Sequence, residues 1–300
     1  MRTPLQNIVA TQLSSLSGFG FQDFIKFLMR IHYGNDAVQE LRSVKDEGAD
    51  CLISSCRICI ACYAPEKKVS ANIIIQKLRG DFDSYKTNWQ VLYPTWHFYT
   101  NLEPSPEQVK LVATWGSKHK LHGSEHILFM VETDSTGSPR KYPDRYRIYQ
   151  KLNIGKEYLG RDFLNTLLND LISGNYLTDK VRSLSEAPEI IRKLRANSTE
   201  AEHREFEARI TATYELQIEV EQVLRSYDTS SINTIKNIIV QDYYNIVQND
   251  STASEFQRMK RLIEKYEWKY NGELKDDMLS AYIAALVWYV FSQCHIGNKP

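Results

Sequence analysis

Large apolar residues recur at helical spacing near the start of the chain, in the stretch FQDFIKFLMRIHYG. They lie three or four positions apart, at Phe21, Phe24, Phe27, Leu28 and Ile31. This pattern predicts an amphipathic helix that ends at Gly34. Three short β-like runs follow, around residues 38–44, 50–54 and 57–64, and the last, RICIACYA, is apolar on both faces. We therefore predict a helix followed by a three-stranded meander with a buried central strand.

The following segments carry both helix and strand signals. Residues 67–89 have a helical pattern that we expect to break near Gly80, and the aromatic run WHFYTN predicts a strand. The capping box Ser105-Pro106-Glu107-Gln108 predicts a helix that runs to about Trp115. HILFMVE fits a strand or a short buried helix, and TDSTGSPRKYPD is predicted to be a loop. Four apolar residues mark one more helix, at Phe163, Leu167, Leu168 and Leu171.

The pattern changes after about Gly174, beyond which it is typical of long helices with short breaks. We place the domain boundary between Leu177 and Glu186. The predicted fold is an α/β domain with a central mixed sheet over residues 1–180, followed by an all-α module over residues 187–300. The last helix contains YIAALVWYVF, which is apolar almost all round, so it must be enclosed and suggests packing against something larger.

Composition restricts the class of protein. The chain has 37 basic and 37 acidic residues, so a surface for nucleic acid must be local. No N-terminal apolar block is long enough for a signal peptide, and the longest apolar run, residues 281–291, is too short to span a bilayer. Four of the five cysteines lie between Cys51 and Cys62, unlike a secreted disulfide framework. We expect a cytoplasmic protein without a membrane partner.

The order of motifs in the first 90 residues points to phosphodiester chemistry. A helix with Gly18-Phe19-Gly20-Phe21-Gln22 precedes the acidic turn KDEGAD, which ends at Asp50, and the strand RICIACYAPEKK follows. Metal-assisted cleavage needs carboxylates that converge on Mg²⁺ with a cation beside the attacking water, and strands hold such groups rigidly. This order resembles the restriction-endonuclease-like PD-(D/E)XK family, specifically its Mrr-like branch, with a G-x-x-FQ-x-F helix and a G-x-D turn.

The resemblance implies a DNA-cutting site, and the central strand departs from it. In the natural register the family's Gln-or-Glu, any residue, Lys motif falls on Ala61-Cys62-Tyr63, which has neither the carboxylate nor the lysine. Glu66 and Lys68 restore the motif if the strand continues past Pro65, although proline disfavours that continuation. Catalysis would then use Asp50, Glu66 and Lys68, with Asp50 and Glu66 binding Mg²⁺. The alternative is a degenerate site that serves as a scaffold for DNA or another subunit.

A basic segment interleaved with tyrosines is the best candidate for nucleic-acid contact. Its cations are Arg140, Lys141, Arg145, Arg147 and Lys151, and its tyrosines are Tyr142, Tyr146 and Tyr149. Gln22, from the family-like helix, is added to this predicted interface, although it could instead cap the acidic turn. A solvated loop and edge strand would explain the basic segment equally well.

Two further patterns suggest metal binding. Cys51, Cys56, Cys59 and Cys62 have the spacing that opens a plant-type iron–sulfur site. In an extended strand, however, Cys59 and Cys62 point to opposite faces, so we interpret them as small buried hydrophobes. Three histidines, His119, His122 and His126, fit no familiar zinc spacing and are interpreted as surface or core residues.

The C-terminal ending FSQCHIG, after a helix with INTIKNIIVQDY, resembles the C-terminal domain of effector subunits in ABC-three-component systems. That resemblance implies a prokaryotic anti-phage or anti-plasmid complex with an SMC-like ABC ATPase and a third subunit. It also implies that the helical module docks the effector on the ATPase. The leading hypothesis is therefore a Mg²⁺-dependent nuclease effector, and the second is a catalytically inactive scaffold.

Overall fold

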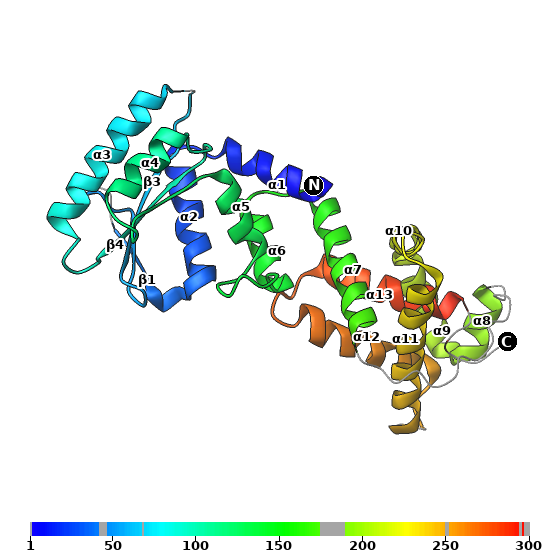
Figure 1. Ribbon diagram of the computed structural model, residues 1–300. Helices are drawn as coiled ribbons and strands as arrows, with labels where there is room; N and C mark the ends of the chain where they lie inside the picture. The colour runs from blue at the N-terminus through cyan, green and yellow to red at the C-terminus, as the bar shows by residue number, and fades with distance from the viewer. Residues whose placement is uncertain are drawn as a thin grey trace. The chain divides into compact units, whose positions relative to one another are not determined.

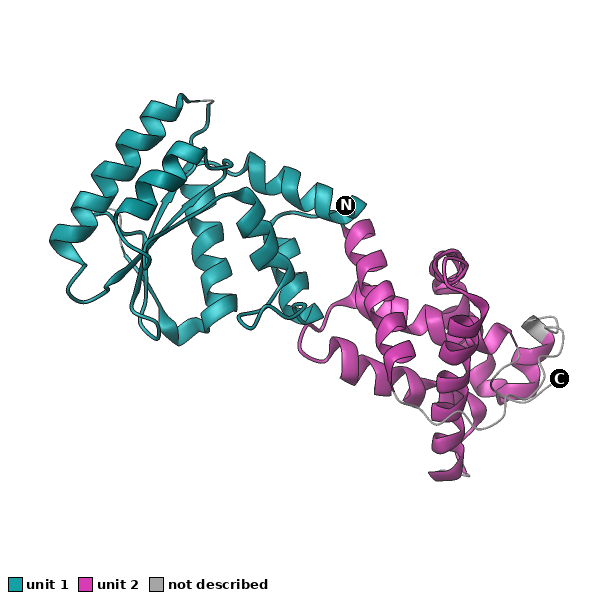
Figure 2. Cartoon of the chain, in the orientation of Figure 1, with its two compact units in different colours: residues 1–155 teal, residues 156–300 magenta. Residues whose placement is uncertain are grey.

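The computed structural model describes residues 2–41, 47–67, 69–174, 190–249, 252–293 and 296. The chain forms two compact units, residues 1–155 and 156–300 (Figure 2). The first unit is α/β with one mixed sheet and the second is helical, which confirms the predicted class. Among the described residues, no helix combines the length and the apolar character that crossing a bilayer requires.

The sheet of the first unit has five strands in sequential order. They are β1 (Val38–Glu40), β2 (Cys51–Ile53), β3 (Ile58–Tyr63), β4 (Thr95–Thr100) and β5 (Lys120–His122). The first three strands form the predicted antiparallel meander, and β4 and β5 continue parallel to β3. Strand β3 is central and buried on both faces, as its uninterrupted apolar run predicts. Strand β5 was not predicted.

Helices cover both faces of this sheet (Figure 1). The first unit contains α1 (Pro4–Ser15), α2 (Gly18–Tyr33), α3 (Ala71–Asn88), α4 (Pro106–Thr114), α5 (Ser124–Glu132) and α6 (Tyr142–Lys151). Helices α3 and α4 contribute to the apolar core on one face, where Phe82 and Trp96 meet edge to face. Helix α2 packs against β1 and β3, and α5 packs against β5. The meander is therefore enclosed between two helical layers.

Three local predictions can now be judged. Helix α2 ends at Gly34, whose φ of 92° favours glycine, and α4 begins with the predicted Ser105–Gln108 capping box. The predicted break at Gly80 is wrong, because α3 continues through it. A glycine inside a helix costs only about 1 kcal/mol, which the burial of Leu78 and Phe82 in the core offsets.

The second unit is built around one apolar helix. Its helices are α7 (Lys156–Ser173), α8 (Ile190–Asn197), α9 (Glu200–Ala212), α10 (Tyr214–Leu224), α11 (Thr229–Asn249), α12 (Glu255–Asn271) and α13 (Asp277–Ser292). Helix α13 contacts α7, α10, α11 and α12, so the chain itself encloses the helix that sequence predicted must be covered. Helices α9 and α10 meet at Thr213, which ends one and begins the other.

The units divide earlier in the chain than predicted. The predicted boundary, Leu177 to Glu186, lies outside the described residues, and α7 groups with the helical unit instead of with the sheet. The reason is packing, because α7 lies against α10, α11 and α13. Gly160 of α7 lies directly against the ring of Tyr282 on α13. An apolar stripe marks α7 as a helix but cannot tell which core the stripe joins.

Candidate active site

The predicted metal ligand Asp50 lies immediately before β2, where it helps to join β2 to β3. Its backbone N–H donates to the Ile60 carbonyl at 2.7 Å, and its carboxylate accepts the backbone N–H of Cys62 at 2.6 Å. The preceding turn has positive φ at Glu47 and Gly48, and a side chain at Gly48 would collide with the backbone of α3. Asp50 therefore extends the hydrogen bonding between β2 and β3, next to a turn that packs against α3. Its carboxylate stabilises the sheet by pairing a backbone N–H.

The central strand presents the family's catalytic positions to an apolar core. Ala61 and Tyr63 lie two residues apart on β3, on the face covered by α3. Ala61 is only 2% exposed, and Tyr63 is half-buried against the same core. A carboxylate and a lysine at these positions would have to enter that core. The natural register thus places an apolar contact where the nuclease family places charge.

The alternative pair, Glu66 and Lys68, is only partly described. Strand β3 ends at Tyr63 and does not continue past Pro65. Proline has no N–H to donate to a neighbouring strand, which favours this end. The carbonyl of Ala64 instead accepts the backbone N–H of Gly18, which joins the strand end to the start of α2. Glu66 is exposed in the bend that follows, and Lys68 lies outside the described residues. The strand extension on which the restored motif depended is therefore wrong.

The two predicted Mg²⁺ ligands, Asp50 and Glu66, are in different surroundings. No group of three His, Cys, Asp or Glu side chains is placed to hold a metal ion within the described parts of the chain. Mg²⁺ requires near-octahedral oxygen ligands, usually with more than one group supplying them. Here one carboxylate already binds a backbone N–H, and the other is exposed in a bend. Gln22 is half-buried on α2 and forms no hydrogen bond to the described turn 47–50.

Arg140 has a structural role at the end of α5. Its side chain is buried, and its guanidinium donates to the carbonyls of Met130, Val131 and Thr133 at the end of α5. It also lies 3.3 Å from Nδ1 of His32 on α2. A cation is well placed beside the last carbonyls of a helix. The burial of Arg140 disfavours the predicted contact with nucleic acid, which stays a prediction.

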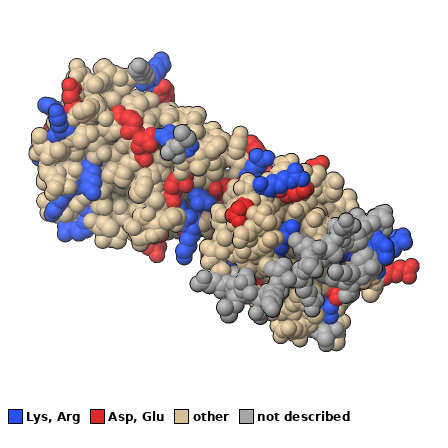
Figure 3. Space-filling model, turned by 45° about the vertical axis from the view of Figure 1, so that its right-hand side comes forward, with Lys and Arg blue, Asp and Glu red and all other residues tan. Residues whose placement is uncertain are grey.

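The remaining cations of the basic segment lie on a helix rather than on a loop and edge strand. Lys141, Arg147 and Lys151 are exposed and Arg145 is half-buried. Arg147 pairs with Asp144 at 3.6 Å. The three tyrosines are buried, so their rings cannot stack on bases and that part of the prediction is wrong. On the described surface visible in Figure 3, basic and acidic residues are interspersed without a continuous basic patch.

The cysteines behave as buried hydrophobes. Cys59 belongs to the core under α3, whereas Cys62 points to the opposite face of β3, as predicted. Burial, reinforced by the Asp50 carboxylate, raises the pKa of Cys51 to about 12, and burial also raises the pKa values of Cys59 and Cys62. Iron–sulfur clusters need thiolates, which these positions disfavour.

His122 and His126, which the sequence suggested as surface or core residues, form a row with His97 that was not predicted. Nε2 of His122 lies 3.4 Å from Nδ1 of His97, and the His122 ring stacks on His126 and on Tyr99. Burial lowers the pKa of His97 to about 4 and that of His122 to about 2, so both rings are neutral at pH 7. Parallel pairing of β4 with β5 brings His97 next to His122, and strand pairing cannot be seen in the local sequence.

Comparisons with protein-family models, with curated proteins and with solved structures give no match to this chain. The candidate site must therefore be interpreted from its own geometry.

Proposed function

We propose that this chain is a nuclease-fold scaffold subunit of a prokaryotic defence complex. It binds DNA, and its Asp50 region does not cut that DNA. The family assignment comes from the order of the FQ-x-F helix, the G-x-D turn and the apolar strand. The scaffold role depends on one observation: Ala61 and Tyr63 face the apolar core under α3. Hydrolysis of a phosphodiester needs charged groups at such positions, because metal ligands and the activating cation must converge on one water.

DNA contact in this proposal uses the exposed cations of α6. Lys141, Arg147 and Lys151 present charges at the surface, and cations there can neutralise phosphates without reading sequence. With the tyrosines buried, no base stacking is expected from this helix. Binding should therefore be sequence-independent and strongly weakened by salt.

The helical unit supplies the proposed docking surface for an SMC-like ABC ATPase. Because α13 is enclosed within its own unit, docking would have to use residues outside that core. Trp268 on α12 is 84% exposed, and Tyr214 and Ile218 lie one turn apart on α10 with large exposed fractions. Exposed aromatic residues of this kind are frequent anchors in protein interfaces.

A Mg²⁺-dependent nuclease is the second candidate, and one observation favours it. Glu66 is exposed just beyond the end of β3, so its carboxylate is accessible to a cation. Cleavage would require Glu66 and Lys68 to join Asp50, with Mg²⁺ held by the two carboxylates.

Plasmid cleavage separates the two candidates. The full chain, alone and together with an SMC-like ABC ATPase as the proposed partner, would be incubated with supercoiled plasmid and Mg²⁺. The scaffold proposal predicts no cleavage that depends on Asp50, Glu66 or Lys68. Cleavage that is lost in Asp50→Asn and Lys68→Ala, but kept in the control Asp83→Asn on the exposed face of α3, would establish the nuclease instead.

A further inference from the structure

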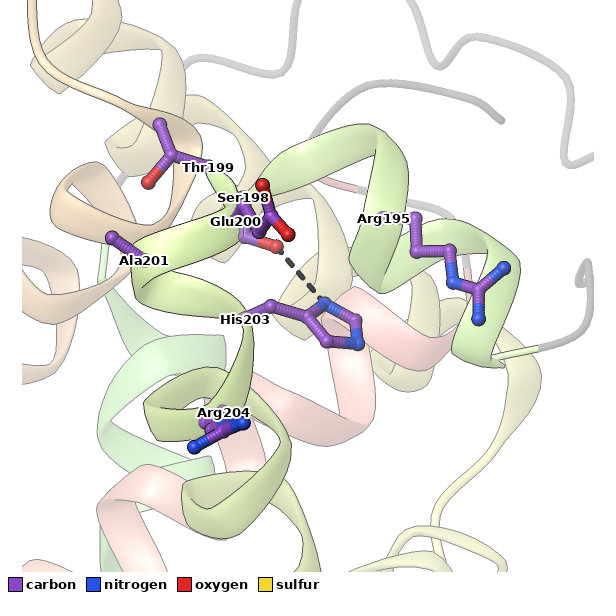
Figure 4. A pocket seen from close by; sticks show the side chains of 7 residues that line it. All are labelled: Arg195, Ser198, Thr199, Glu200, Ala201, His203 and Arg204. Carbon is purple, nitrogen blue, oxygen red and sulfur yellow. Dashed lines mark hydrogen bonds between the residues drawn. The ribbon is translucent and has the colours of Figure 1, made fainter.

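A pocket in the helical unit lies apart from every residue that the proposed function uses. It has a volume of about 670 Å³ and lies where α8 meets α9. Small-molecule sites typically occupy about 300–1,000 Å³. The pocket is lined by Arg195, Ser198, Thr199, Glu200, Ala201, His203 and Arg204 (Figure 4).

The charged side chains of the lining are two arginines and one glutamate, so its net charge is positive. Arg195 comes from α8 and Arg204 from α9, and neither forms an ion pair with an acid of the described chain. Glu205 on α9 pairs instead with Arg209 and Lys260. Glu200 is the one carboxylate in the lining, so one net positive charge remains and the pocket attracts an anion.

His203 is held in place between the two arginines. The Ser198 hydroxyl donates to the Leu194 carbonyl at 2.8 Å, so toward Nδ1 of His203, 3.3 Å away, it can only accept. Nδ1 therefore carries the proton. Figure 4 shows the other ring nitrogen, Nε2, turned toward the side of Arg195. With the proton on Nδ1, that nitrogen can accept a hydrogen bond from a ligand hydroxyl.

The end of helix α9 does not account for this attraction. The Glu202 carboxylate already accepts the backbone N–H of Thr199 at 3.1 Å and its hydroxyl at 2.8 Å. A negative charge is thus already present at the helix N-terminus, which compensates the helix dipole there. Any further anion must be held by the side chains of Arg195 and Arg204.

We propose that this pocket binds a nucleotide through its phosphate groups. Guanidinium groups match phosphate geometry, and two of them facing one pocket suit a chain of phosphates better than a single carboxylate. Glu200 accepts hydrogen bonds when ionised, so it suits a sugar hydroxyl and would repel a bare phosphate. No lining residue is aromatic, so the base gains no stacking and nucleotides with different bases should bind alike.

Isothermal titration calorimetry of the full chain, with ATP and with GTP as separate ligands, tests this inference. Saturable binding is expected, with similar affinities for the two nucleotides. Arg195→Gln and Arg204→Gln should each weaken binding about tenfold, the loss expected for one charge-assisted hydrogen bond. The matched control is Arg209→Gln on α9, whose guanidinium pairs with Glu205 outside the pocket, and it should bind like the wild type. Because these arginines are exposed, the variants should fold, which circular dichroism would verify.

Competition between inorganic phosphate and ATP shows whether the pocket prefers a nucleotide to free phosphate. Glu200→Gln should improve the binding of inorganic phosphate relative to that of ATP, because it removes the repelling charge. The inference is overturned if ATP shows no saturable binding at millimolar concentration, or if Arg209→Gln weakens it as much as the pocket variants. It is also overturned if duplex DNA, but not ATP, binds in a manner that depends on Arg195 and Arg204. This test does not measure plasmid cleavage. A failure to bind nucleotide would therefore leave the proposed scaffold role intact.

Discussion

The carboxylate of Asp50 accepts the backbone N–H of Cys62 at 2.6 Å, so the residue that the nuclease family would use for metal binding joins two strands here. Cys62 is buried, and water cannot easily replace this acceptor. Asp50→Ala should therefore lower the free energy of unfolding by about 1–3 kcal/mol, because it leaves a buried donor unpaired. Asp50→Asn keeps an acceptor oxygen and should cost less. Urea denaturation measures both, and equal stability of Asp50→Ala and wild type would contradict the structural role.

Arg140 should matter for stability and not for binding. Arg140→Ala removes donors to three carbonyls at the end of α5 and should cost about 3 kcal/mol. Its exposed neighbour provides the control, since Lys141→Ala should change stability by less than about 0.5 kcal/mol. Thermal denaturation of both variants checks this expectation. A stable Arg140→Ala protein that had lost DNA binding would restore the original interpretation of this arginine.

Gly160 provides a test of the assignment of α7 to the helical unit. A Cβ at this position would overlap the ring of Tyr282, whose hydroxyl donates to Glu219 at 2.7 Å. Gly160→Ala should therefore destabilise the chain by about 1–3 kcal/mol through overpacking. Gly80→Ala should have the opposite sign, about 0.5–1 kcal/mol of stabilisation, because nothing lies near its Cβ position in α3. If both substitutions shifted the urea midpoint in the same direction, the packing described here would be contradicted.

The predictable parts of the fold were those with a local signature. The spacing of Phe21 and Phe24 predicted α2, and the uninterrupted apolar run of β3 predicted its central position. Short β5 has no such signature, because its three residues gain their partner only from β4. Likewise, the charge of Arg140 is visible in sequence, whereas its burial beneath the end of α5 depends on packing. The site was located by motif order, and the direction in which Ala61 and Tyr63 face required the structure.

The stacked histidines predict that acid destabilises the α/β unit. The folded pKa values of His97, about 4, and His122, about 2, lie below the ordinary value of 6.5, since burial disfavours the charged ring. The unfolded chain therefore binds more protons below pH 6.5. Stability is complete above that pH and is lost as pH falls toward 4, by at most about 2 kcal/mol per ring at pH 5.

The measurement for this prediction is the urea midpoint at pH 7 and at pH 5. His97→Gln should reduce the loss between the two pH values, because it removes one ring that must stay neutral. A pH dependence that is identical in His97→Gln and wild type would show that other groups cause it.

Direct binding of a divalent cation tests the proposal that the Asp50 carboxylate supports the fold and does not bind a catalytic metal. Mn²⁺, which can replace Mg²⁺ at oxygen sites and is detected by electron paramagnetic resonance, would be titrated into the full chain and into Asp50→Asn. The account predicts that the two proteins give the same weak binding. Stoichiometric Mn²⁺ binding by the wild type that disappears in Asp50→Asn would contradict it.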